Sequence, residues 1–374
     1  MGKIMLAVLA TLSLLTANDT NRNTDWTDDP IPVTVETPEE PAPSGHPDSF
    51  YRRRVVKISD GAAGIKVLGE RRLASSGGIM MDYTCSGVEF NADCRKRIGF
   101  KIKVTDSCSF KVYVDGKLYK NGSEDYFIIE GAEDQVVTGT IVIKVSEGVH
   151  NIRLVKVSHY RLALACLTRI VLYGEILPER PKAKERYIEF IGDSLMCGWG
   201  IAGNHDGTCL SVDGTLAWPY LATQQLEADY SIFAMSGQGA YYGEPSIQDC
   251  YLKTSYQRSK KKYSFKRVPD IVIIDVGTND YTYKTGEDAF RQAYLNIITM
   301  VREKYGQDVK ILMTYNIKND EYGSVLRDIA QQQNITIHKF ARSKNEATRY
   351  HPSVEESVSY AYEIVELVSE MLED

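Results

Sequence analysis

Three short polar stretches of this 374-residue sequence carry side chains whose chemistry is complementary. Gly192-Asp193-Ser194-Leu195 places a serine hydroxyl directly after an apolar run, where a buried strand can present it at the mouth of a sheet. Gly277-Thr278-Asn279-Asp280 offers an amide that can donate a hydrogen bond to an oxyanion. His351-Pro352-Ser353 offers an imidazole just before a helix whose first residue is expected to be proline. Each stretch alone is weak, but all three lie at predicted strand-end loops, which indicates one shared site.

The region that holds these stretches alternates between strand-like and helical patterns. Apolar runs typical of buried strands occupy residues 187–191, 230–235, 271–274, 311–313 and 335–338. Helical spacing occupies residues 216–228, 288–304, 325–333 and 354–372, with Ser324 expected as an N-cap. This alternation predicts a parallel sheet covered by helices on both faces, in which sites form beyond the carboxyl ends of the strands.

The preceding region, residues 51–177, has the shorter period of β-strands. Residues 110–114 run into Asp115-Gly116, which is a hairpin-turn signal. Residues 141–145 are expected to turn at Glu147-Gly148 and to return as 152–157, and 170–173 form a final run. Short alternating runs separated by turns predict an all-β sandwich, joined to the second domain by residues 178–184.

The first fifty residues are expected to lie outside both domains. Lys3, the apolar run 4–15 and the small residues after it are typical of a secretory signal peptide over residues 1–17. Residues 18–50 form a Pro-rich linker with too few large apolar side chains to fold. These features predict a secreted, periplasmic or cell-surface protein. Export permits disulfides, and the odd number of cysteines, seven, leaves at least one free thiol.

The composition argues against several classes of partner. Lys and Arg number 44 against 50 Asp and Glu, and the net charge of −6 gives no general attraction to nucleic acid or to an anionic membrane. No apolar segment approaches the length of a membrane span. The sequence has no CxxC pair and no HExxH motif, so we predict neither a metal nor a cofactor.

Together with Ser236-Gly237-Gln238-Gly239, the three stretches resemble the four sequence blocks of the SGNH, or GDSL, hydrolase superfamily. The resemblance implies that Ser194 is a nucleophile and that His351 is its general base. It also implies an oxyanion site formed by the N–H of Ser194, the Asn279 side chain and a glycine N–H. Gly239 is the first choice for that glycine and Gly237 is the second.

Further stretches are similar to carbohydrate esterase family 2. They are Ile188-Glu189-Phe190-Ile191-Gly192-Asp193-Ser194, Cys197-Gly198-Trp199-Gly200, Ala228-Asp229-Tyr230-Ser231, Pro269-Asp270-Ile271-Val272-Ile273 and Ile65-Lys66-Val67-Leu68-Gly69. The resemblance implies a two-domain fold: an N-terminal jelly-roll β-sandwich over 51–177 and a C-terminal α/β/α SGNH hydrolase domain over 185–374, with a flavodoxin-like parallel sheet. It also implies removal of O-acetyl groups from plant cell-wall polysaccharide such as xylan or mannan, through an acyl-serine intermediate and without a cofactor.

One position departs from the superfamily pattern. SGNH hydrolases usually carry an aspartate two or three residues before the histidine, where this sequence has Arg349 and Thr348. The nearest upstream acid is Glu346. We therefore predict a Ser-His dyad in which a backbone carbonyl orients the His351 ring, with Glu346 as the alternative.

Aromatic residues near these loops suggest a sugar surface. Trp199, Trp218 and Tyr241 could stack on sugar rings, or the tryptophans could pack against the sheet. Two other functions stay open. A short-chain lipase or thioesterase is one, and the sequence shows no long apolar lid to hold its acyl chain. A catalytically dead glycan-binding protein is the other, against which the joint presence of serine, asparagine and histidine counts.

Overall fold

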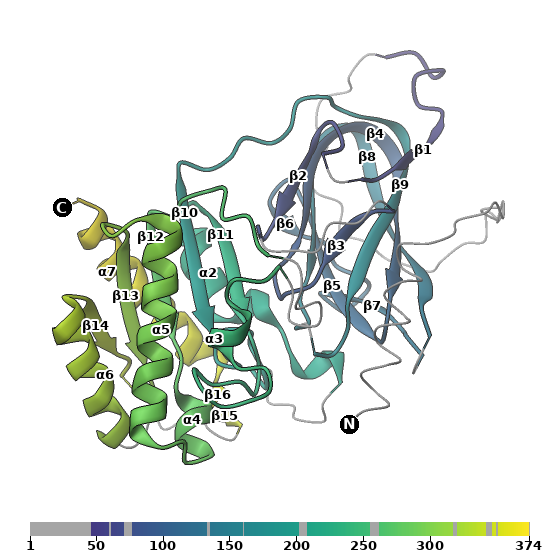
Figure 1. Cartoon of the computed structure of the whole chain (residues 1–374). Coiled ribbons are helices and arrows are strands. Elements are labelled where there is room, and N and C mark those ends of the chain that lie inside the picture. Colours follow the sequence, from purple (N-terminus) through teal and green to yellow (C-terminus); the bar gives the residue numbers. More distant parts are fainter. Residues whose placement is uncertain are drawn as a thin grey trace.

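The computed structural model describes residues 46–373 apart from 60, 71–76, 133–134, 160, 202–207, 255–261, 317–319, 342–345 and 349–350. Two sheets lie beside each other, an antiparallel one nearer the N-terminus and a parallel one flanked by helices (Figure 1). This arrangement confirms the predicted fold class. The predicted signal peptide and most of the predicted linker lie outside the described residues.

The antiparallel sheet of the described chain has nine strands, in the order β1-β9-β4-β8-β5-β6, with β2 on β4, β3 on β9 and β7 on β5. Their bounds are Arg53–Lys57 (β1), Ile65–Leu68 (β2), Ile79–Met81 (β3), Gly87–Val104 (β4), Cys108–Val114 (β5), Lys117–Leu118 (β6), Phe127–Ile129 (β7), Val137–Lys156 (β8) and Ala165–Ile176 (β9). Side chains such as Phe90, Phe100, Ile143 and Leu154 gather in one apolar core. Burial of these side chains stabilises the sandwich.

The hairpin expected at Glu147-Gly148 is wrong, because β8 continues through both residues. Gly148 pairs with Cys94 of β4, next to a shift in register, and its φ of 144° is one that glycine tolerates easily. The irregularity therefore lies within a long strand pair and does not end it. The predicted turn at Asp115-Gly116 is confirmed, since both residues have positive φ and β5 pairs with β6 across them.

The parallel sheet has the order β11-β10-β12-β13-β14, which is the flavodoxin-like order. Its strands are Arg186–Gly192 (β10), Ala228–Ala234 (β11), Ile271–Asp275 (β12), Lys310–Tyr315 (β13) and Thr336–Lys339 (β14). Alternate side chains of β12 enter two different cores: Ile271 and Ile273 join the cluster that contains α2 and α7, whereas Val272 and Ile274 join the cluster of α3, α5 and α6. Both faces are therefore buried, as the continuous apolar runs predict.

The helices cover these two faces (Figure 1). Their bounds are Trp218–Gln225 (α2), Ile247–Cys250 (α3), Thr278–Thr282 (α4), Glu287–Tyr305 (α5), Asp320–Gln333 (α6) and Val354–Glu373 (α7), with 3-10 turns at Cys209–Ser211 (η1) and Gly214–Leu216 (η2). A two-stranded pair, Glu346–Thr348 (β15) and His351–Pro352 (β16), precedes α7.

Two expected helix starts are corrected. α6 begins at Asp320, so Ser324 lies inside the helix and is not its N-cap. α7 begins at Val354, so Pro352 lies before the cap and not at the first helical position. Ser353 takes the capping role: its hydroxyl accepts from the N–H of Glu356 at 3.2 Å, and its own N–H donates to the Glu356 carboxylate at 3.1 Å. This capping box fixes the chain directly after His351.

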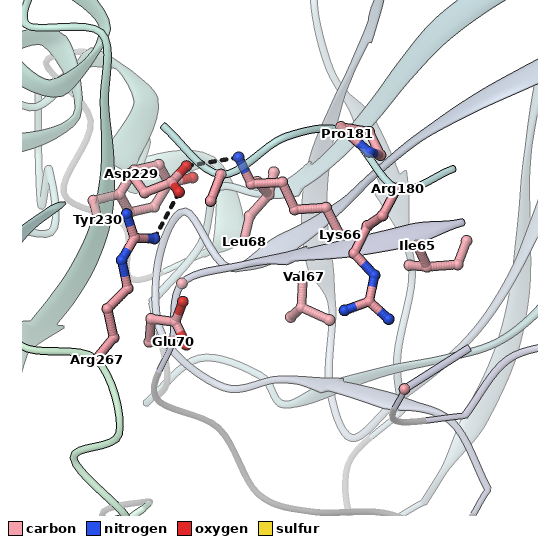
Figure 2. Close-up of a pocket in the computed structure, with 13 residues that line it drawn as sticks. Ile65, Lys66, Val67, Leu68, Glu70, Arg180, Pro181, Asp229, Tyr230 and Arg267 are labelled. Atoms are coloured by element: carbon pink, nitrogen blue, oxygen red, sulfur yellow. Dashed lines mark hydrogen bonds and ion pairs between the residues drawn. The ribbon is translucent and has the colours of Figure 1, made fainter. Parts of the chain in front are cut away.

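Charged side chains join the two sheets near the amino end of the parallel sheet. Lys66 of β2 and Arg267 both donate to the Asp229 carboxylate at the start of β11, at 2.7 Å and 2.6 Å (Figure 2). The N–H of Lys184 in the connection between the sheets donates to the same carboxylate at 3.0 Å. Lys66, Asp229 and Arg267 line a cavity of about 320 Å³. Asp229 therefore ties together the sandwich, the connection and the parallel sheet.

All seven cysteines are buried and none takes part in a disulfide. Burial raises the pKa of the Cys94 thiol to about 12, so this side chain stays neutral at ordinary pH. No helix in the described part of the chain is long and apolar enough to cross a membrane.

Candidate active site

Ser194 lies on a tight turn directly after β10. Gly192 is needed there, because a Cβ at this position would come within 2.3 Å of the Met196 sulfur. The Asp193 carboxylate accepts from the N–H of Leu195 at 3.0 Å, and the Ser194 carbonyl accepts from the N–H of Trp199 at 3.2 Å. These bonds hold the turn while leaving the Ser194 residue 7% exposed. The serine is therefore fixed in a turn that is largely buried.

The structure brings His351 to Ser194 although 157 positions separate them in the sequence. The Nε2 atom of His351 lies 2.8 Å from the Ser194 Oγ atom. His351 begins β16 and pairs with Thr348 of β15, and the capped start of α7 follows it. Strand pairing before His351 and the helix start after it thus fix its backbone. Its imidazole lies within hydrogen-bond distance of a hydroxyl that it can deprotonate.

Asn279 lies in the same group, at the start of α4. Its Nδ2 atom donates to the Asp193 carboxylate at 3.1 Å and to the Gln238 carbonyl at 2.9 Å. The amide therefore connects the turn after β10 with the loop after β11. An oxyanion would share or replace one of these two acceptors.

The structure corrects the first choice of oxyanion glycine. The N–H of Gly239 already donates to the Tyr242 carbonyl at 2.8 Å, so it is not available to an oxyanion. Its bare α-carbon abuts a carboxylate, since a Cβ there would lie 2.1 Å from Asp280. Within the described residues, the N–H groups of Gly237 and Ser194 make no hydrogen bond. Gly237, the second choice, is therefore the glycine whose N–H can donate to an oxyanion.

Three buried aspartates lie behind the serine turn. Burial, and then the nearby Asp275, raise the pKa of Asp193 well above its ordinary value. Burial raises the pKa of Asp275 to about 7 despite a hydrogen bond from Thr314. Burial also raises the pKa of Asp280, against the opposing effect of three backbone N–H donors at residues 240–242. Burial therefore makes each of these carboxyl groups easier to protonate than an aspartate on the surface.

Comparison with known proteins agrees with this geometry. Residues 190–354 match the GDSL-like Lipase/Acylhydrolase family. The chain is 30% identical over 205 residues to the cellulase/esterase CelE of Acetivibrio thermocellus, covering 50% of this chain and 25% of that protein, so it spans a quarter of that relative's length. It is 23% identical over 240 residues to an acetylxylan esterase/glucomannan deacetylase of Cellvibrio japonicus, covering 57% of this chain and 67% of that protein.

A solved family two carbohydrate esterase from Clostridium thermocellum, in complex with cellohexaose, is similar at a TM-score of 0.73 and 25% identity, covering 83% of this chain and 99% of that one. The chain is thus similar to family two carbohydrate esterases in fold, and part of it matches the GDSL-like Lipase/Acylhydrolase family. The match extends over the sandwich as well as the parallel sheet, because 83% of this chain is more than the parallel-sheet region alone.

The predicted sugar-binding aromatic residues have different environments. Trp218 is 1% exposed and packs against Phe190 and Phe340, so it is a core residue and the prediction that it contacts sugar is wrong. Trp199 is half-buried, and Tyr241 is 53% exposed. Both can still meet a ligand, and their contact with sugar stays a prediction.

Sequence reasoning missed two features of this loop region. Tyr242 stacks on the exposed Tyr283 with ring centroids 4.0 Å apart and planes 6° from parallel. Asp280 accepts the N–H groups of residues 240–242 and so shapes the loop after β11. The GTND stretch contained the signal for Asp280, whereas the tyrosine stack joins loops that are not adjacent in the sequence.

The group that orients the His351 ring remains a prediction. Arg349 and the Glu346 side chain lie outside the described residues. The described residues contain no cluster of His, Cys, Asp and Glu that could hold a metal ion.

Proposed function

We propose that this protein is an exported serine esterase that removes O-acetyl groups from acetylated plant cell-wall polysaccharide, such as xylan or mannan. The observation that carries the proposal is the 2.8 Å contact between Ser194 and His351 at the carboxyl end of the parallel sheet. The names of its relatives, which include an acetylxylan esterase/glucomannan deacetylase, support the choice of acetyl ester. Export rests on the sequence of residues 1–17.

The first half of the reaction forms an acetyl-serine. The Nε2 atom of neutral His351 takes the proton from the Ser194 hydroxyl as its oxygen attacks the acetyl carbonyl carbon. The carbonyl oxygen gains a full negative charge, which the N–H groups of Ser194 and Gly237 and the Asn279 amide can receive. The bond from carbon to the sugar oxygen then breaks, and His351 returns the proton to that oxygen.

The second half releases acetate. A water molecule enters the place of the sugar hydroxyl and loses a proton to His351 as it attacks the acetyl carbon. The same N–H groups receive the charge again. The bond to the Ser194 oxygen breaks, and His351 gives the proton back to the serine. No redox step occurs, and the residues named supply every proton transfer.

Acetate release from a panel of acetylated glycans tests this function, with the Ser194→Ala variant as the control for background hydrolysis. We expect release from acetylated xylan or mannan by the wild type and loss of release in the variant. Faster hydrolysis of an octanoyl than of an acetyl model ester would favour a lipase instead. Glycan binding without any acetate release would identify a non-catalytic binding protein.

A further inference from the structure

A segment of the sandwich reaches the loop that follows β11. The segment is residues 157–162, between β8 and β9, and its Arg161 donates from Nη1 to the Ser236 carbonyl at 3.1 Å. Gly237 permits this approach, because a Cβ there would lie 2.6 Å from the same Nη1 atom. His159 of this segment packs edge-on against Trp199, with ring centroids 5.2 Å apart. The sandwich therefore forms one wall beside the candidate active site.

The pairing of β10 with β11 brings the loop that Arg161 contacts close to the serine turn. Gly192 of β10 pairs with Ala234 of β11, and the N–H of Met235 donates to the Gly192 carbonyl at 2.8 Å. Both strands are parallel, so the residues that follow them leave the sheet at the same edge. Ser236 and Gly237, which follow β11, thus lie at the same edge of the sheet as Asp193 and Ser194, which follow β10.

The guanidinium of Arg161 has hydrogen-bonding capacity to spare. Its residue is exposed, and no described carboxylate lies within ion-pair distance of it. Lys66 and Lys111, which also reach from the sandwich to the parallel-sheet domain, are each paired with an aspartate there. An arginine offers five N–H donors, and the Ser236 carbonyl takes one of them.

Arg161 supplies the positive charge on the part of the sandwich that faces the candidate active site. Burial, and then the charges of Lys156 and Arg161, lower the pKa of His159 well below its ordinary value, so its imidazole is neutral. Lys156 is sealed inside, where it donates to the Ser158 carbonyl at 2.6 Å. Arg161 also interacts electrostatically with the hydroxyl of Tyr242, the tyrosine stacked on Tyr283. A cation thus borders an aromatic surface.

We propose that Arg161 is a substrate-binding residue that recognises a carboxylate on the glycan, and that the enzyme favours acetyl groups on acidic polysaccharide carrying uronic acid residues. A planar guanidinium binds a carboxylate through two parallel hydrogen bonds, which neutral sugar hydroxyls do not match. The net charge of −6 gives the chain no general attraction to anions, so the selection is local. The inference rests on the proposed function and names its substrate class.

The test compares two forms of one polymer. Acetylated glucuronoxylan oligosaccharides are the acidic form, and the same oligosaccharides with the carboxylates converted to amides are the neutral form. We expect the wild type to show a kcat/KM for acetate release roughly ten- to a hundredfold higher on the acidic form, as is typical of a charge-assisted pair. Arg161→Gln is expected to bring this ratio close to one, and Arg161→Lys to keep part of it.

Arg180 supplies the matched control, because it is also exposed and lies at the opposite, amino end of the sheet. Arg180→Gln is expected to keep the wild-type ratio. Equal rates of the wild type on the two forms, or an equal loss on both forms in Arg161→Gln, would overturn the inference and leave the esterase proposal standing. Absence of acetate release from either form and from neutral acetylated xylan and mannan would overturn the proposed function itself.

Discussion

The two ends of the parallel sheet are both met by the sandwich, but they use their polar groups differently. At the amino end, Lys66 and Arg267 converge on Asp229 around a cavity of about 320 Å³ (Figure 2). At the carboxyl end, Ser194 meets His351 beside the exposed Arg161. Lys66, Arg267 and Asp229 at the first end pair with one another, whereas Ser194, His351 and Arg161 at the second end can still bind a ligand.

This difference shows that cavity volume alone does not identify an active site. The lining of the amino-end cavity contains no residue of the serine turn, and its Lys66, Arg267 and Asp229 side chains are already paired. The carboxyl end offers a hydroxyl held against an imidazole, and two N–H groups without a partner in the described chain. We therefore assign chemistry to the carboxyl end and structural support to the amino end.

The largest expected difference between the two ends is in turnover. Ser194→Ala removes the attacking oxygen, so we expect kcat for an acetyl ester to fall about 10⁴-fold or more. Asp229→Asn changes a group at the other end, and we expect it to leave kcat unchanged. Steady-state kinetics on p-nitrophenyl acetate checks both variants, with circular dichroism to confirm folding. Comparable losses in the two variants would contradict the division of roles.

Asn279→Ala is expected to have the next largest effect. The amide can stabilise the charge that forms in the transition state, so its loss should lower kcat by 10²- to 10³-fold, equivalent to about 3–4 kcal/mol. KM should change little. Asn279→Asp, which keeps the size and removes the donor, should behave similarly. A rise in KM with unchanged kcat in both variants would instead assign Asn279 to ground-state binding.

The buried Asp275 predicts a stability effect that depends on pH. Burial raises its folded-state pKa from 3.8 to about 7, so the folded state holds a proton that the unfolded chain has lost. Its contribution is fully present below the unfolded pKa and is lost as the pH rises through the folded value. The Asp275→Asn side chain does not ionise, so the variant's stability does not fall as the pH rises, and its amide oxygen can still accept from the Thr314 hydroxyl. Relative to wild type, the variant should gain about 2–4 kcal/mol between about pH 4 and pH 8.

Thermal unfolding of both proteins across this pH range measures the effect. A difference in midpoint that stays constant with pH would show that Asp275 is ionised in the folded state.

The smallest expected effect is at Asp229, and its pH dependence has the opposite sign. Burial opposes ionisation of this carboxyl, but hydrogen bonds from Lys66 and Arg267 outweigh it and lower the pKa. Its contribution is therefore present above the unfolded pKa and lost as the pH falls through the folded value. Asp229→Asn should lower stability by about 1–3 kcal/mol at neutral pH and by less in acid. Thermal midpoints that fall equally at both pH values would contradict the ion-pair account.

The sequence was sufficient for most of the architecture and for the central pair of the site. Largely apolar runs predicted β10 and β12, because strands buried on both faces carry mostly apolar side chains. Ser194 and His351 were identified because each follows a strand or precedes a helix in a recognisable stretch. The family resemblance supplied their expected roles.

The remaining features depend on long-range contacts that a sequence does not display. Gly239 was preferred over Gly237 because the Tyr242 carbonyl that occupies its N–H is known only from the folded loop. Trp218 was offered as a sugar contact because its neighbour Phe340 is distant in the sequence. Arg161 belongs to the other domain, so no local pattern connects it with the serine turn.

Covalent labelling of the serine tests the central claim most directly. Diethyl p-nitrophenyl phosphate reacts with an activated serine to give a stable adduct, and peptide mass spectrometry locates it. We predict a single adduct on Ser194 in the wild type, no adduct in Ser194→Ala and strongly slowed labelling in His351→Ala. Labelling of a different residue, or an unchanged labelling rate in His351→Ala, would contradict the account.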